Sequence, residues 1–183
     1  MSDEVFVQCC APTLAGLKTG SMFSFPYPDR AGMIADVRSL NRTLASRGIC
    51  VLPLRYRAGK ALLYVFRPGK LRRDLKEKEA RELLRRAGYA EDNLAPCLNR
   101  LRERLNSGED FPHEVGLFLS YPPEDVRGFI ENGPKGCKLT GYWKVYGDEK
   151  AARETFEKFR KCTESYQRSL DAGIPLARLA VAV

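Results

Sequence analysis

Apolar residues in the first fifty positions follow first a strand pattern and then a helix pattern. Residues 21–25 form a short apolar run that predicts a strand, and a Pro-Tyr-Pro sequence ends it. Asp29 is a suitable N-cap for a helix that we expect to continue to about residue 47. The apolar positions of this helix recur at helical spacing and stop before a glycine: Ile34, Val37, Leu40 and Leu44.

Two β-rich runs follow this helix, at residues 49–56 and 60–67. The Arg-Ala-Gly sequence between them is typical of a hairpin turn, so we expect the two runs to pair as antiparallel strands. Residues 1–20 are the hardest to assign, because residues 10–20 contain Pro12 and two glycines. We expect no long regular element there.

The middle of the chain has the spacing of two helices, at residues 70–87 and 92–105. The second of these carries one apolar face, at Leu94, Cys97, Leu98, Leu101 and Leu105. An Asn-Ser-Gly sequence ends it.

The last third returns to a strand-then-helix pattern. Residues 115–119 read as a buried strand, which a Tyr-Pro-Pro sequence ends before a short helix. Residues 141–147 alternate like a second strand. Asp148 then caps a final helix, whose apolar face we place at Ala152, Phe156, Phe159, Cys162, Tyr166 and Leu170.

Each end of the chain therefore reads as a strand–helix–strand half. An internal duplication and convergence on one turn sequence would both explain this likeness. Because the elements do not alternate regularly, we expect an α+β fold in which helices cover a mixed or antiparallel sheet. We expect one domain over residues 1–183, with possible halves 1–69 and 111–183 joined by a basic helical segment, 70–107.

Composition is that of an ordinary globular protein, with 44% hydrophobic and 30% charged residues. No apolar run approaches the roughly 20 residues that span a bilayer, and the acidic start lacks the features of a signal peptide. Six cysteines occur without a CxxC pair. These features favour a cytoplasmic protein with reduced thiols.

The net charge of +8 comes from one segment. Residues 55–104 contain fifteen Lys or Arg and seven Asp or Glu, whereas the remainder contains sixteen of each. Such an excess can attract nucleic acid, an acidic protein or an anionic small ligand. The alternative is a solvated helix surface on which Glu77, Glu79 and Glu82 pair with bases four residues away.

Candidate catalytic groups are few. His113, the single histidine, precedes Glu114, and the two side chains could form an acid–base pair, since histidine titrates near neutrality. An HExxH zinc site is excluded because Leu117 occupies the second histidine position. Cys10 could lie at an irregular, accessible position where Lys18 lowers its pKa. The alternatives are a histidine bonded to backbone and a buried cysteine.

Candidate ligand-binding groups form a second set. The sequence has neither a Walker A nor a GxGxxG motif, although the Gly-rich loop at 133–138 could cradle an anion. Aromatic residues around Trp143, the single tryptophan, could form a stacking platform, or the tryptophan could be a core residue. The ligand-binding candidates are Thr13, Lys18, Tyr121, Trp143 and Lys144. We expect no metal site.

Three stretches carry a family resemblance: Cys-Ala-Pro-Thr-Leu-Ala-Gly-Leu-Lys-Thr-Gly at residues 10–20, Pro-His-Glu-Val-Gly-Leu-Phe-Leu-Ser-Tyr-Pro-Pro-Glu-Asp-Val-Arg-Gly-Phe-Ile-Glu-Asn at residues 112–132, and Gly-Tyr-Trp-Lys-Val-Tyr at residues 141–146. The chain resembles an uncharacterised bacterial family, found mainly in anaerobes, called domain of unknown function 3793. The resemblance covers nearly the whole chain. It implies a His-Cys pair where this chain has Cys9-Cys10. It implies no established activity, and it suggests iron or redox physiology.

Three functions are compatible with these features. The first is non-catalytic binding of a ligand or partner, namely an anionic cofactor or an acidic redox partner. The second is an iron-, haem- or thiol-redox-related enzyme that uses Cys10, His113 and Glu114. The third is nucleic-acid binding through residues 55–104. The sequence defines no cofactor and leaves open whether the protein is an enzyme.

Overall fold

The chain forms two compact units. The computed structural model describes residues 1–90, 93–108 and 111–182. Unit 1 consists of Met1–Lys70 and Phe159–Val183, and unit 2 consists of Leu71–Lys158. Unit 2 is thus inserted into the sequence of unit 1. This division differs from the expected halves 1–69 and 111–183, because the end of the chain belongs with its beginning.

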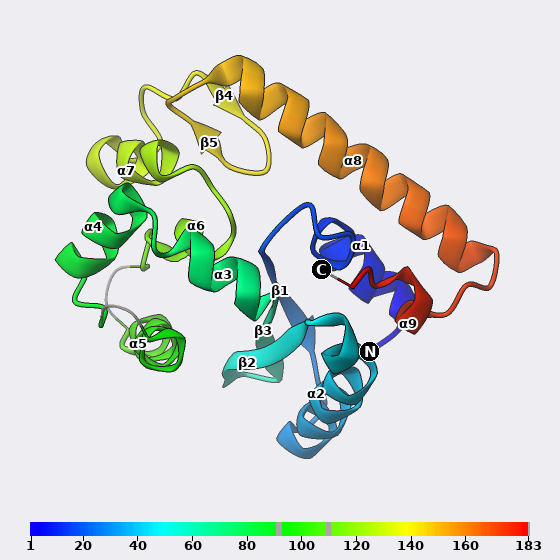
Figure 1. Cartoon of the computed structure of the whole chain (residues 1–183). Helices are drawn as coiled ribbons and strands as arrows, with labels where there is room; N and C mark the ends of the chain where they lie inside the picture. The colour runs from blue at the N-terminus through cyan, green and yellow to red at the C-terminus, as the bar shows by residue number, and fades with distance from the viewer. Residues whose placement is uncertain (91–92, 109–110, 183) are drawn as a thin grey trace. The chain divides into compact units, whose positions relative to one another are not determined.

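A three-stranded antiparallel sheet forms the centre of unit 1 (Figure 1). Its strands are β1 (Gly20–Pro26), β2 (Cys50–Arg57) and β3 (Lys60–Phe66), in the order β1-β3-β2. The expected hairpin is confirmed. Ala58 and Gly59 form its two-residue turn with φ values of 49° and 70°, the left-handed conformation that suits the twist of a hairpin.

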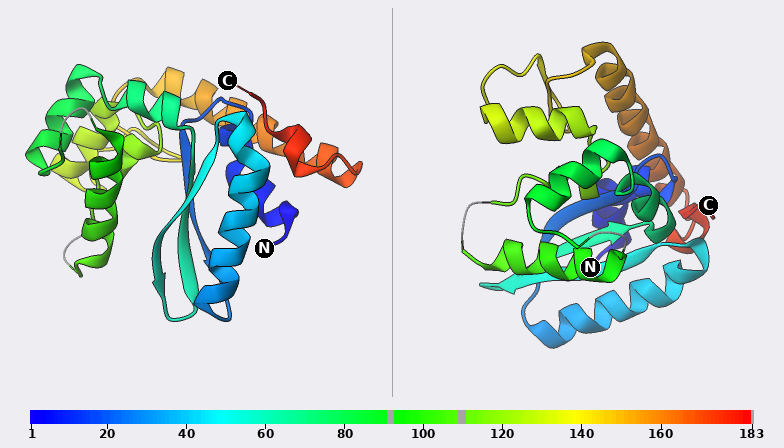
Figure 2. Two further views of the ribbon diagram at one scale, coloured as in Figure 1. Left: turned by 60° about the horizontal axis from the view of Figure 1, so that its bottom comes forward. Right: turned by 60° about the vertical axis from the view of Figure 1, so that its left-hand side comes forward.

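The helix expected after Asp29 is also confirmed. It consists of α2 (Arg30–Leu44) and a 3₁₀ turn, η1 (Ala45–Arg47). Asp29 Oδ1 accepts a hydrogen bond from the Gly32 N–H at 2.8 Å, and so caps the helix start. The Asn41 side chain bonds both the N–H and the C=O of Val51, at 2.8 and 2.9 Å. These bonds hold α2 alongside the sheet (Figure 2).

The expectation of no regular element in residues 1–20 is wrong, since α1 spans Asp3–Leu14. Ser2 caps its first turn. Pro12 is tolerated near the helix end, where Gly16 adopts a φ of 74°. The Leu17 N–H then bonds the Pro12 C=O at 2.9 Å, which closes the helix with a glycine-dependent C-cap.

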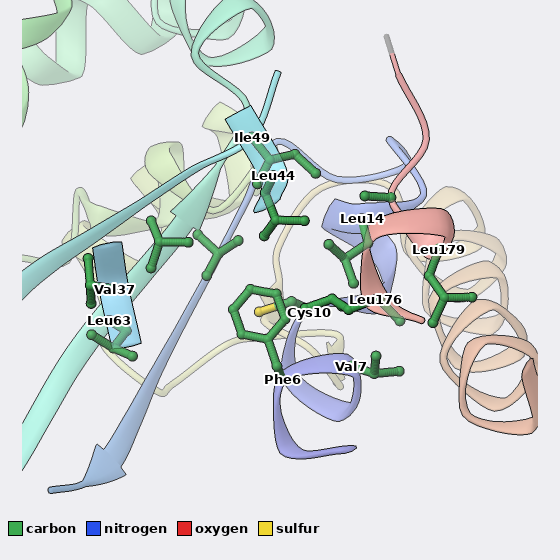
Figure 3. Packing of buried hydrophobic residues seen from close by; sticks show 14 of the residues in the cluster. Phe6, Val7, Cys10, Leu14, Val37, Leu44, Ile49, Leu63, Leu176 and Leu179 are labelled. Carbon is green, nitrogen blue, oxygen red and sulfur yellow. The ribbon is translucent and has the colours of Figure 1, made fainter. Parts of the chain in front are cut away.

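One apolar core lies between the helices and one face of this sheet. It includes Phe6, Cys10 and Leu14 of α1, together with residues of α2 and the sheet. The last helix, α9 (Leu176–Leu179), adds Leu176 and Leu179 (Figure 3). The C-terminal segment is therefore part of the core of unit 1.

Unit 2 is mostly helical. Its elements are α3 (Pro68–Asp74) from Leu71 on, α4 (Lys78–Arg86), α5 (Leu94–Asn106), α6 (Val115–Phe118), α7 (Pro123–Asn132), β4 (Leu139–Thr140), β5 (Lys144–Val145) and the first part of α8 (Glu149–Asp171). The helix expected over 70–87 is thus two helices. The next expected helix, over 92–105, is confirmed as α5, although Asp92 lies outside the described residues.

Two expected strands of unit 2 need correction. Residues 115–118 form the helix α6 instead of a strand, and all four are buried. A short apolar run fits a buried strand and a buried helix equally well. Only Lys144–Val145 of the run 141–147 is a strand. The α+β class with an antiparallel sheet is confirmed, but the second half is not strand–helix–strand.

Candidate functional site

Unit 2 contains a cavity of about 320 Å³ between α6, α7 and the β4–β5 hairpin. We call it the aromatic pocket. Its lining residues are Phe111, His113, Val115, Gly116, Tyr121, Asp125, Val126, Phe129, Trp143 and Lys144. A second hollow of unit 2, beside Leu84, measures only about 30 Å³. The aromatic pocket alone of these two has room for a small organic molecule.

Aromatic rings define two walls of the aromatic pocket. Tyr121 stacks on Trp143, with ring centroids 5.1 Å apart and an interplanar angle of 29°. His113 meets Phe129 edge-to-face at 4.8 Å. Both arrangements are preferred geometries of aromatic pairs. Phe111 extends the second wall and is 54% exposed, so part of the pocket is open to solvent.

A buried carboxylate fixes the tryptophan wall. Asp125 is 3% exposed, and its Oδ2 accepts a hydrogen bond from Trp143 Nε1 at 2.7 Å. Its Oδ1 accepts from the backbone N–H groups of Tyr146 and Gly147, each at 2.7 Å. Three accepted hydrogen bonds offset the free-energy cost of burying a carboxylate. Asp125 therefore attaches the β4–β5 hairpin to α7.

Glycines permit the close packing around these rings. A Cβ at Gly116 would lie 2.8 Å from Val126 and 2.9 Å from Tyr121. A Cβ at Gly128 would lie 2.4 Å from the Tyr146 ring. Real Cβ atoms do not approach other atoms so closely, so α6 and α7 need glycine at these positions.

The end of α6 directs Tyr121 into the pocket. Ser120 has a φ of 62°, which reverses the chain after the helix. The Tyr121 N–H then donates to the Gly116 C=O at 3.0 Å. This is the six-to-one bond of a helix C-cap, in which the residue after the left-handed position folds back over the helix. Tyr121 consequently lies over Gly116.

His113 and Glu114 do not form the expected acid–base pair. His113 is exposed and contacts the rings of Phe111 and Phe129. Glu114 is 4% exposed and accepts hydrogen bonds from Arg104 Nε at 2.6 Å and from the Tyr89 hydroxyl at 2.9 Å. Burial and the Glu114 charge raise the pKa of Tyr89. Glu114 is thus part of a buried ion pair, whereas His113 lines the pocket.

The remaining candidates, Thr13, Lys18 and Cys10, belong to unit 1. Cys10 is buried on α1 rather than accessible, and Figure 3 shows its sulfur among apolar side chains. Burial raises the pKa of its thiol well above the usual value, although Lys18 acts in the opposite sense. The Thr13 and Ser21 hydroxyls bond each other at 2.9 Å. Cys10 and His113 therefore lie in different units.

Two other expectations concern charged segments. Glu82 pairs with Arg86 at 2.6 Å, four residues away as expected, but Glu79 pairs with Arg127 of α7. In the loop at 133–138, Lys138 Nζ donates to the Gly147 C=O at 2.7 Å. Where the structure describes the chain, it brings together no group of three or more His, Cys, Asp or Glu side chains that could hold a metal ion.

Sequence reasoning missed Asp125 and Arg67. Asp125 follows the Tyr-Pro-Pro sequence as an ordinary helix-start acid, and its role depends on the hairpin that returns to it. Arg67, the residue after β3, is 2% exposed and donates to the carbonyl oxygens of Thr13 and Leu14, each at 2.7 Å. The sequence contains no signal for either set of partners.

Fold and pocket together define an α+β protein with a small-molecule-sized aromatic pocket in its inserted unit. The profile of the family described as "protein of unknown function (DUF3793)" matches residues 6–180. The chain belongs to this family, which confirms the resemblance. No curated protein and no solved structure matches the chain. None of the described helices is long and apolar enough to cross a membrane.

Proposed function

We propose that the protein is a non-catalytic binding protein whose ligand is a small aromatic anion held in the aromatic pocket. The observation that carries this proposal is the combination of stacked rings and a lysine around one cavity of about 320 Å³. The expected ligand has a flat ring and a single anionic group, as in an aromatic carboxylate.

The shape of the pocket supports an aromatic ligand. Rings in preferred stacked and edge-to-face arrangements present faces and edges to a further ring at little cost in conformational entropy. Its volume lies at the lower end of the range for small-molecule sites. One or two fused rings would fit such a volume better than a larger cofactor.

The charges of the lining support an anion. Lys144 lines the pocket, and the 3.5 Å separation of its Nζ from Thr140 Oγ1 makes that hydrogen bond a weak one. Asp125 also lines the pocket, but its two oxygens already accept three hydrogen bonds. Lys144 is therefore the group best able to bind a carboxylate, with His113 as a second donor.

Thiol chemistry has less support. A nucleophilic cysteine must be a thiolate, and burial raises the pKa of the Cys10 thiol. Cys10 also belongs to the core of unit 1, whereas the pocket belongs to unit 2. Binding at the pocket requires none of the cysteines.

Ligand-observed NMR with three probes tests the proposal. Benzoate is the aromatic anion, benzamide is its neutral analogue, and cyclohexanecarboxylate is an anion of similar size without an aromatic ring. We expect benzoate to bind most tightly. Substitution of Lys144→Met should weaken benzoate roughly tenfold, the equivalent of about 1.4 kcal/mol, and should leave benzamide unchanged.

Lys135→Met is the matched control, because Lys135 is exposed and lies outside the pocket lining. It should leave benzoate binding unchanged. Equal binding of benzoate and cyclohexanecarboxylate would contradict a stacking site. Equal losses of benzoate affinity in the two lysine variants would show that the net charge of the protein, and not the pocket, attracts the anion.

A further inference from the structure

The charged side chains of the sheet in unit 1 all have the same sign. The three strands contain Arg55, Arg57 and Lys60 and no Asp or Glu. Neither Arg57 nor Lys60 forms an ion pair with a carboxylate in the described part of the chain. Arg57 lies directly opposite Lys60, and two like charges in directly opposed positions destabilise a strand pair. Arg57 and Lys60 are therefore available to an anion from outside the sheet.

Strand register places these cations on one face. Leu62 of β3 lies opposite both Ser24 and Arg55, and Lys60 lies opposite Arg57. Directly opposed residues share a face, and so do residues two apart on one strand. All five side chains consequently project from the same face. Ala61 and Leu63 project from the other face, into the core.

The five residues and Ala58 line a hollow of about 250 Å³ at the hairpin end of the sheet. We call it the basic hollow. Ser24, Arg57 and Lys60 are exposed, and Arg55 is half-buried. The lining thus consists of three cations, a hydroxyl group and two small apolar surfaces, with no acidic side chain.

We propose that the basic hollow is a binding site for a diphosphate group. The Arg57 guanidinium offers forked donors that match phosphate oxygens, and Lys60 adds a mobile positive charge. The Ser24 hydroxyl can donate to the same oxygens. A volume of about 250 Å³ exceeds that of one phosphate and accommodates two linked phosphoryl groups. The site lies in unit 1, so it does not depend on the aromatic pocket of unit 2.

Inorganic diphosphate and ADP both present two linked phosphoryl groups. The first is a free anion, and the second carries these groups as part of a nucleotide. The hollow recognises the phosphoryl groups in either case. Calorimetric titration of the full chain with inorganic diphosphate, with inorganic phosphate and with ADP distinguishes them. We expect diphosphate to bind more tightly than phosphate. A gain in affinity for ADP over diphosphate would identify a nucleotide as the ligand, and equal affinities would identify the free anion.

Paired substitutions test the position of the site. Arg57→Gln with Lys60→Gln should weaken diphosphate binding roughly tenfold or more. Arg38→Gln with Arg42→Gln removes the same charge from exposed positions of α2, and should change the affinity by less than about twofold. Thermal unfolding followed by circular dichroism verifies that both variants fold.

Three results would overturn the proposal. The first is no binding of diphosphate or ADP by the wild-type chain. The second is an equal loss of diphosphate affinity in the two double variants, which would mean that the overall positive charge of the protein attracts the anion. The third is tight binding of a single-stranded oligonucleotide that both double variants weaken equally, since that indicates an extended nucleic-acid surface. Benzoate binding at the aromatic pocket should be unaffected throughout.

Discussion

At the scale of single residues, burial decides what each candidate group can do. His113 and Glu114 are neighbours in sequence, yet one lines a solvent-open pocket and the other is 4% exposed in an ion pair with Arg104. Cys10 and Lys18 are both buried in unit 1, where burial disfavours the thiolate and the ammonium. Chemical reactivity is thus suppressed at Cys10.

Lys18 predicts a specific dependence of stability on pH. Burial lowers its pKa from 10.5 to about 8, although Cys10 opposes this shift. The folded protein therefore holds this proton less tightly than the unfolded chain does. Deprotonation of Lys18 therefore raises the free energy of unfolding as pH rises from about 8 to 10.5, and this increase is lost as pH falls.

Lys18→Met should therefore be more stable than wild type at pH 7, by about 1–3 kcal/mol. The advantage should shrink by pH 9.5, because the wild-type amine is then largely neutral. Urea unfolding at both pH values measures it. Lys78→Met, at an exposed position, is the control and should show no such change. An advantage of equal size at both pH values would contradict a buried ammonium.

At the scale of elements, close packing at glycines holds the β4–β5 hairpin against α7 and α8. A Cβ at Gly141 would lie 2.2 Å from the Phe156 ring of α8, and one at Gly128 would lie 2.4 Å from Tyr146. These positions lie in two of the sequence stretches that carry the family resemblance. Those stretches therefore describe a packed substructure around the aromatic pocket.

Two glycine substitutions distinguish the effect of this close packing on stability from the effect of helix propensity. Gly128→Ala should destabilise the protein by about 1–3 kcal/mol, because the added methyl group displaces the Tyr146 ring. Gly69→Ala in α3 should be neutral or stabilising by up to about 1 kcal/mol, since a Cβ there meets nothing within 4 Å. Chemical denaturation measures both. Stabilisation by Gly128→Ala would contradict the close approach.

Turn and cap chemistry made some elements predictable. Asp29, Gly48 and the Arg-Ala-Gly turn specified α2 and the hairpin because each residue type suits a particular backbone conformation. The helix α6 was not predictable, because it is buried on all sides and has no amphipathic period. The helix α1 was missed because Pro12 and Gly16 lie at its end, where both are tolerated.

The candidate site was predictable to a similar extent. The structure brings Tyr121, Trp143, Lys144 and His113 to one pocket, and all four were candidates from the sequence. Thr13, Lys18 and Cys10 lie in the other unit. Sequence spacing cannot show that residues about a hundred positions apart lie in separate units, because that division depends on where the end of the chain packs.

At the scale of the whole molecule, Arg67 joins the two separate segments of unit 1. Its Nη2 donates to the carbonyl oxygens of Leu14 and Val181, at 2.7 and 2.8 Å, and its Nη1 donates to that of Arg47 at 3.2 Å. The guanidinium thus connects α1 and η1 with the C-terminal segment. Burial lowers the pKa of Arg67, but its bonds to carbonyl groups compensate its charge.

Arg67→Met should destabilise unit 1 by about 3 kcal/mol or more, because it leaves buried carbonyl oxygens without donors. Thermal unfolding followed by circular dichroism measures the loss. Arg73→Met, at an exposed position of α3, should cost less than about 0.5 kcal/mol. Equal effects of the two substitutions would contradict the role of Arg67 in joining the segments.

Emission of Trp143 tests the ligand-binding proposal most directly, because Trp143 is the single tryptophan and lines the aromatic pocket. Benzoate is titrated into the wild-type protein and into Tyr121→Ala, with excitation at wavelengths that benzoate does not absorb. We predict a saturable change in wild-type emission and weaker binding by Tyr121→Ala. Binding of benzoate by NMR without any change in Trp143 emission would place the ligand elsewhere and contradict the proposal.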